Sequence, residues 1–171
     1  NLAVFYNKIK DFQVRAASSA ALGAIPVNGL INAGDAHSDG AELELSALPV
    51  TGLRIDASLS YLHTAYDKIN PTVTLPANVA GRTTLLGLDF PLSPHWQAGG
   101  SIDYRLPLKI PGTLRLGGDI QYESRRYPDI YNTAQIAVPA QTFVNGTINY
   151  TTVRGDLSFG VRANNIFNVQ H

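Results

Sequence analysis

Histidine and carboxylate side chains that could hold a metal gather in one short stretch. In the run DAHSD (Asp35–Asp39), a histidine stands between carboxylates, and these nitrogen and oxygen donors suit a divalent cation. A polar approach to a strand is the favoured alternative, because no two histidines have a metal-ligand spacing such as H-x-x-x-H. We therefore expect no metal ligand and no cofactor at any of the histidines, which are His37, His63, His95 and His171.

Ser93 and His95 could belong to a nucleophilic site of the lipase type. Such a site needs a histidine that reaches the serine hydroxyl and a third group that orients the histidine, and nothing in the sequence fixes that geometry. Glycines in the runs AGGS and GGDIQ fall inside strand-like stretches, where they give room for curvature or close packing. We expect no catalytic residue, and the chain is predicted not to be an enzyme.

A third stretch, YESRRYPDIY (Tyr122–Tyr131), combines aromatic rings with paired arginines. Aromatic faces and guanidinium groups together suit anionic or aromatic ligands. The favoured alternative is an ordinary polar rim, so ligand binding is a hypothesis here. Its candidate substrate-binding residues are Tyr66, Arg125, Arg126, Tyr127 and Tyr131.

The elements that must position these residues are strands, because apolar residues recur with a period of two. Helical periodicity is poor, and the alanine-rich stretch Val14–Ala24 is expected to be a loop, with one helical turn at most. Residues Leu2–Val14 alternate less cleanly and are predicted as a seventh strand. The six clear strands are Ala41–Leu48, Leu53–Tyr61, Trp96–Leu106, Leu114–Glu123, Thr142–Tyr150 and the alternating part of Asp156–Asn168.

Each predicted strand has one apolar face and one polar face. On the apolar face, every second residue of the six clear strands is uncharged. A soluble sandwich also alternates in this way, so the partition alone does not separate a protein core from lipid. The charged residues all lie on the intervening face: Glu42, Glu44, Arg54, Asp56, Asp103, Arg105, Arg115, Asp119, Glu123, Asp156 and Arg162.

The links between strands separate the two possibilities. Short links (Pro49–Gly52, Pro107–Gly112 and Thr152–Gly155) alternate with long ones (Arg15–Gly40, Ala65–Pro94 and Arg126–Gln141). All short links therefore fall at one end of the sheet and all long links at the other, as in transmembrane barrels with short periplasmic turns and long extracellular loops. Tyr and Trp toward the strand ends would form the interfacial girdle of such a barrel.

The composition agrees with this interpretation and excludes other classes. The 171 residues carry 13 basic and 13 acidic side chains, without the basic excess of a nucleic-acid-binding protein. Charged residues make up only 15% of the chain, against about 25% in an ordinary soluble domain. There is no cysteine, and no apolar stretch is long enough for a transmembrane helix.

Several of these stretches, in their order and spacing, resemble TonB-dependent outer-membrane receptors. FYNKIKDFQV near the start and the long run Asn32–Tyr66 are similar to late barrel strands of that family. LLGLDFPLSPHWQAGGSIDY (Leu85–Tyr104) resembles its loop in which a proline is closely followed by an aromatic residue and a strand. SFGVRANNIFN (Ser158–Asn168) resembles its penultimate strand, with Ile166 where the family commonly has leucine.

The resemblance implies an all-β fold: about seven up-and-down antiparallel strands of a larger transmembrane β-barrel, which has 22 strands in that family. Residues 1–171 are then expected to be the C-terminal part of the barrel, without the plug domain, the TonB-contacting segment and the final strand. The implied location is the outer membrane of a Gram-negative bacterium. The implied partners are membrane lipid, TonB, the plug and a small-molecule nutrient, most commonly a ferric siderophore, and no nucleic acid.

Three other functions remain open from the sequence. A passive porin-like barrel would share the strands and turns but have no plug. A soluble β-sheet binding module would need the apolar face to meet protein. An outer-membrane hydrolase would need Ser93 or His95 for activity.

Overall fold

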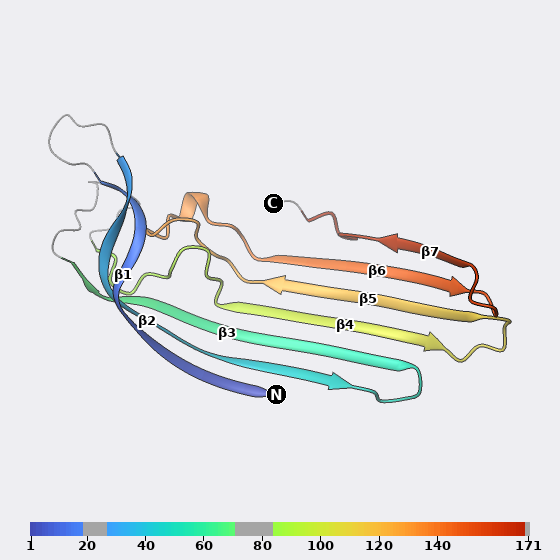
Figure 1. Cartoon of the computed structure of the whole chain (residues 1–171). Helices are drawn as coiled ribbons and strands as arrows, with labels where there is room; N and C mark the ends of the chain where they lie inside the picture. Colours follow the sequence, from blue (N-terminus) through green and yellow to red (C-terminus); the bar gives the residue numbers. More distant parts are fainter. Residues whose placement is uncertain (19–26, 71–83, 170–171) are drawn as a thin grey trace.

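The computed structural model describes residues 1–18, 27–70 and 84–169, with the side chains of residues 15–18, 27–29 and 31 left out. The described residues form one antiparallel sheet in which neighbours in sequence are neighbours in space (Figure 1). One 3-10 turn, η1 (Ala134–Ile136), is the helical element in this part of the chain. The strands are β1 (Leu2–Ser18), β2 (Val27–Ala47), β3 (Leu53–Ile69), β4 (Trp96–Leu106), β5 (Thr113–Glu123), β6 (Gln141–Thr151) and β7 (Ser158–Ala163). The prediction of seven antiparallel strands is confirmed.

The apolar face of the sheet lies uncovered. Its large side chains stand open to the surroundings from one edge to the other, as Leu45 (57% exposed), Ile120 (47%) and Phe159 (61%) illustrate. Monomeric soluble proteins rarely expose an apolar surface of this extent, since burying it would stabilise them. In a bilayer the same face meets hydrocarbon, so the uncovered face agrees with a transmembrane wall. No helix in the described part of the chain could span a membrane.

The polar face carries local pairs between neighbouring strands. The guanidinium of Arg115 lies 3.3 Å from the carboxylate of Asp103. Asp119 instead accepts a hydrogen bond of 2.7 Å from the Asn145 amide. Arg105 donates to the Thr113 hydroxyl. These pairs satisfy the polar groups along the inner wall without a dense protein core behind them.

The short links are tight turns at one end of the sheet, drawn on the right of Figure 1. Gly112 follows β4 with a φ of +107°, a backbone conformation that side chains rarely adopt. A Cβ added to Gly112 would lie 2.4 Å from the Thr151 carbonyl oxygen. Only glycine fits this close approach of the turn to β6.

At the other end, β1, β2 and β3 continue well past the predicted strand ends. The sequence predicted a loop over Val14–Ala24 and a long link over Arg15–Gly40. Both predictions are wrong for the residues that the structure describes, because residues up to 18 and from 27 onward form paired strands. Residues 19–26 lie outside the described part. The alternation of apolar and polar residues is lost here because the loops of residues 84–95 and 124–140 bury part of the extension, while the β1–β2 hydrogen bonds continue. Bulges near Phe12 shift the register at the same point.

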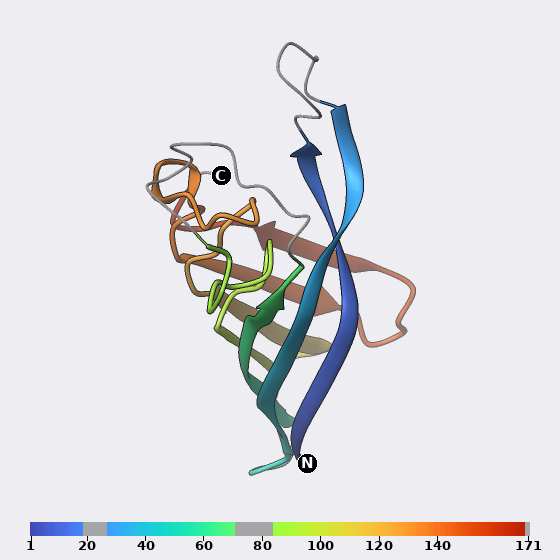
Figure 2. The same cartoon turned by 90° about the vertical axis from the view of Figure 1, so that its left-hand side faces the viewer.

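A small hydrophobic core fills the concave side of this extension. The loops of residues 84–95 and 124–140 fold back over the ends of β1–β3, as the end view shows (Figure 2). We call this assembly the cap. Its buried core consists of Val14, Ala33, Ala36, Tyr66, Leu85, Leu88 and Ile130, with Phe12, Ile69, Phe90 and Tyr131 packed against it.

Candidate ligand-binding cap and outer histidine cluster

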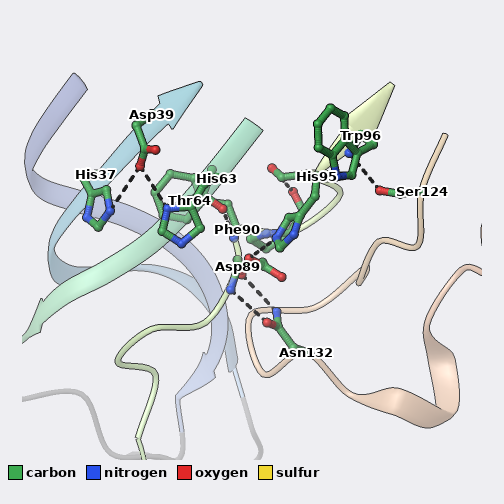
Figure 3. Close-up of polar contacts among 12 residues, drawn as sticks. His37, Asp39, His63, Thr64, Asp89, Phe90, His95, Trp96, Ser124 and Asn132 are labelled. Atoms are coloured by element: carbon green, nitrogen blue, oxygen red, sulfur yellow. Dashed lines mark hydrogen bonds and ion pairs between the residues drawn. The ribbon is translucent and has the colours of Figure 1, made fainter. Parts of the chain in front are cut away.

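Two loops of the cap are joined through one buried asparagine. Asn132, only 5% exposed, accepts a hydrogen bond from the Asp89 backbone N–H (2.9 Å) and donates one to the Asp89 carbonyl (3.0 Å) (Figure 3). Its positive φ of 50° suits asparagine better than most residues. Thr64 of β3 holds the same loop by accepting a hydrogen bond from the Phe90 N–H. The cap is therefore a hydrogen-bonded unit and not a set of free loops.

Tyr66 lies in the centre of the cap and is 1% exposed. Its ring meets Phe12 edge-on and lies 5.3 Å from the Phe90 ring, centroid to centroid. The hydroxyl finds no hydrogen-bond partner among the described residues. Burial raises the pKa of the Tyr66 phenol to about 12. In this geometry Tyr66 is a packing residue, and its predicted contact with substrate stays a prediction.

The four other predicted residues follow β5 in the loop of residues 124–140. Arg125 is exposed, while Arg126 is half-buried beside Glu123, with which it forms an ion pair. The Tyr127 carbonyl accepts a hydrogen bond from Leu92 of the neighbouring cap loop. Tyr131 packs against the core, and burial, with Asp129 nearby, raises the pKa of its phenol. The structure thus brings Tyr66 and Tyr131 to one cluster and leaves the arginines at its edge.

Arg126 also borders a polar hollow on the concave face below the cap. Side chains from five strands, β2 to β6, line this hollow, and the Gln97 amide donates a hydrogen bond of 3.4 Å to the Glu123 carboxylate within it. Carboxylates, hydroxyls and amides lie on its walls beside apolar groups such as Leu59 and Phe143, so it offers both kinds of contact to an occupant. Its polar lining includes Glu42, Glu44, Ser58, Ser60, Gln97, Gln121, Glu123, Arg126 and Gln141.

A separate group of titratable side chains lies on the opposite, convex face of β2 and β3. Asp39 pairs with His63 across the two strands, and the His63 Nδ1 lies 2.9 Å from the Asp39 carboxylate. The His37 Nε2 lies 3.5 Å from the same oxygen (Figure 3). We call these three residues the outer histidine cluster. Sequence reasoning missed His63, because antiparallel register, and not spacing along the chain, brings it to Asp39.

The cluster lies just beyond a pair of aromatic side chains on the same face. Tyr61 of β3 and Trp96 of β4 are register partners whose ring centroids lie 4.8 Å apart. Trp96 is 45% exposed on the convex side. Amphipathic aromatic rings are typical of the membrane–water interface, so in a bilayer the cluster would lie on the water side of that boundary.

The comparison with known families decides what kind of protein carries this sheet. The family profile described as "TonB dependent receptor-like, beta-barrel" matches residues 1–166. The chain belongs to the TonB-dependent receptor family. The resemblance found in the sequence is thereby confirmed. No curated protein sequence matches the chain.

Three solved TonB-dependent receptors share the fold. The ferric preacinetobactin receptor BauA of Acinetobacter baumannii has a TM-score of 0.69 at 20% identity over 98% of this chain and 23% of its own. The ferric yersiniabactin uptake receptor FyuA of Yersinia pestis (0.72, 19% identity) and the siderophore receptor PiuA of Acinetobacter baumannii (0.71, 21% identity) each match over 98% of this chain and 22% of theirs. The chain therefore spans less than a quarter of each of these receptors.

Members of the TonB-dependent receptor family are receptors and transporters and not enzymes, which agrees with the prediction made from the sequence. The geometry around Ser93 and His95 fits the same conclusion. The Ser93 hydroxyl donates weakly to the Pro91 carbonyl, whereas the His95 Nε2 lies 2.7 Å from the Asp89 carboxylate. The two residues serve the structure of the cap loop.

Proposed function

We propose that this chain forms an arc of the barrel wall of an outer-membrane receptor that imports a scarce nutrient with energy delivered through TonB. The observation that carries the proposal is the single-layer sheet, apolar and uncovered on one side and polar on the other. Membership of the TonB-dependent receptor family supports it, since barrels of this family reside in the outer membrane of Gram-negative bacteria.

In this proposal, the chain is one part of a larger barrel that surrounds a plug domain. A seven-stranded sheet in lipid would leave backbone groups unpaired along its edges, each at a cost of several kcal/mol. Further strands would pair with those edges, and the plug would meet the polar face. The local pairs on that face, such as Arg115 with Asp103, would then form the wall that the plug contacts.

The proposed substrate class is a ferric siderophore. The three solved neighbours are described as siderophore receptors, which supports this class without establishing it for this chain. The predicted residues that would contact such a substrate are Tyr66, Arg125, Arg126, Tyr127 and Tyr131. Of these, Arg126 has the best placement, because it borders the polar hollow below the cap. To bind an anionic chelate by charge-assisted hydrogen bonds, the Arg126 guanidinium would exchange its ion pair with Glu123 for the ligand.

Growth and uptake experiments on the bacterium that produces this protein test the proposal. Under iron limitation, deletion of the gene is expected to abolish uptake of one labelled ferric siderophore, and deletion of TonB is expected to have the same effect. Uptake that needs the gene but persists without TonB would point to a passive barrel. Unchanged uptake of every siderophore tested would contradict the proposed substrate class.

A further inference from the structure

We propose that the outer histidine cluster is a site for a transition-metal dication, with His37, Asp39 and His63 as its three protein ligands. One potential ligand atom from each residue lies within 4.8 Å of the others. Two imidazoles and one carboxylate form a donor set preferred by Zn²⁺ and similar ions. Three ligands leave a fourth position open to water or to another anionic or neutral donor.

The distances between donor atoms fit a metal. Bonds of about 2.0–2.1 Å in a tetrahedral site place neighbouring ligand atoms roughly 3.3 Å apart. The separation of His37 Nε2 from the Asp39 oxygen is 3.5 Å, which is long for a hydrogen bond and close to this value. The His63 Nδ1 at 2.9 Å from the same oxygen needs to move outward by only a few tenths of an ångström.

A fourth side chain fixes the orientation of the first ligand. The Nδ1 of His37 lies 2.6 Å from the carboxylate of Asp67, so that Nε2 faces Asp39. A carboxylate on the far nitrogen is the usual outer-shell partner of a metal-binding histidine, where it sets the ring orientation and raises basicity. The Tyr6 ring stacks on His37 at a centroid distance of 5.7 Å and supports its other side.

The strand pairing holds the ligands in place before any ion binds. Asp39 and His63 are register partners in the β2–β3 ladder, and His37 is two residues along the same face of β2. The three side chains are partly exposed, with 19%, 38% and 39% of the His37, Asp39 and His63 side chains accessible. An ion could therefore enter from solvent on the convex side. This site lies across the sheet from the polar hollow and is independent of the proposed substrate.

Zinc titration of the detergent-solubilised barrel protein that carries these strands tests the site. Calorimetry is expected to give one Zn²⁺ per molecule, and the His63→Ala variant is expected to lose most of this affinity. Loss of an outer-shell partner typically costs about 10–100-fold in metal affinity, so Asp67→Asn should weaken binding by that factor. Asp156→Asn is the matched control for a lost carboxylate, since Asp156 lies outside the cluster, in the turn between β6 and β7 at the other end of the sheet.

Co²⁺ provides a readout that needs no variant. Absorption bands of tetrahedral Co²⁺ in the unmodified protein, removed by an excess of Zn²⁺, would support the site. Zinc binding that is equal in the unmodified protein and in His63→Ala, or lost equally in Asp156→Asn, would overturn it. Absence of both zinc heat and cobalt bands in the unmodified protein would also overturn it. None of these measurements involves a siderophore or TonB, so they stand apart from the proposed function.

Discussion

Asn132 and Asp89 are 43 residues apart in the sequence and are joined by two backbone-directed hydrogen bonds, in which the Asn132 side chain binds both the N–H and the carbonyl of Asp89. One side chain thus joins the two cap loops with a pair of hydrogen bonds, as a neighbouring strand would. The Asp89 carboxylate in turn lies 2.7 Å from the His95 Nε2, just before β4 begins. The order of the cap depends on this small polar connection as well as on its apolar core.

Asn132→Ala should therefore loosen the cap. It leaves two partly buried backbone groups of Asp89 without their partner, and a loss of this kind costs at most about 1–3 kcal/mol. Hydrogen exchange of the Asp89 amide is expected to accelerate, while amides in the middle of β4 stay protected. Asn132→Gly retains the positive φ but not the hydrogen bonds, so it should accelerate exchange as well. The exposed Asn7 provides a control, and unaltered exchange in both Asn132 variants would contradict the assignment.

Tyr66→Phe is expected to be neutral or stabilising at neutral pH. The hydroxyl is buried and has no hydrogen-bond partner among the described residues. Folding therefore removes it from water without a compensating hydrogen bond, and phenylalanine avoids this loss. Tyr66→Ala, by contrast, removes a large ring from the core and should cost about 3–5 kcal/mol. Thermal unfolding in detergent measures both effects. A marked loss of stability in Tyr66→Phe would show that the hydroxyl has a partner that matters.

The pH dependence of stability offers a second test of Tyr66. Burial raises the folded-state pKa from 10.0 to about 12, so the neutral phenol is favoured in the folded protein. Below pH 10 the phenol is neutral in both states and its contribution is complete. As pH rises from 10 to 12, the unfolded chain releases the proton first and stability falls. Tyr66→Phe should lack this fall, which a comparison of unfolding temperatures across that range would reveal.

Ile120→Arg separates a lipid-facing wall from a soluble sheet. Ile120 lies near the middle of β5 on the uncovered apolar face. In a bilayer, an arginine there should cost about 2–4 kcal/mol. Gln121→Arg places the same charge one residue along on the polar face and should be tolerated. Folding equilibria in lipid vesicles measure the difference, and equal stability of the two variants would contradict the membrane assignment.

Gly112→Ala and Gly155→Ala compare two turn glycines with positive φ. The added Cβ at Gly112 would clash with the Thr151 carbonyl, whereas the Cβ at Gly155 would meet nothing within 4 Å. Both variants bear the conformational cost of a non-glycine residue in this region, about 1 kcal/mol or more. Gly112→Ala should be the less stable of the two in the same unfolding assay. The reverse order would mean that the turn after β4 can move away from β6.

Arg126→Gln tests the proposed substrate contact. Loss of one charge-assisted hydrogen bond, about 1.5–3 kcal/mol, should weaken binding of an anionic ferric siderophore about 10–100-fold. Arg54→Gln is the matched control, because Arg54 pairs with Asp56 far from the cap. Equilibrium binding to the purified receptor gives both affinities. Equal affinity in both variants would remove Arg126 from the candidate set and leave Arg125, Tyr127 and Tyr131 to be tested.

The membrane-spanning part of this fold could be predicted closely from the sequence. Trp96–Leu106 has the same bounds in the structure as in the prediction, because lipid on one side and water on the other impose strict alternation. Beyond Tyr61 that constraint ends, and the pattern gave no sign that β3 continues to Ile69. Asp39 and His63 meet in the register of the β2–β3 hairpin, which runs unshifted from the Ala47–Ile55 pair. A search for metal-ligand spacing along the chain does not detect residues that strand pairing brings together.

Because side chains alternate along a strand, residues 61–66 of β3 contact different groups on the two faces of the sheet. His63 belongs to the outer histidine cluster on the convex side, while Thr64 and Tyr66 hold the cap on the concave side. A single layer of backbone therefore separates the outer histidine cluster from the core of the cap. A twist or shift of this segment cannot be confined to one side. A spectroscopic label on the outside of β3 would therefore report events inside the barrel without entering it.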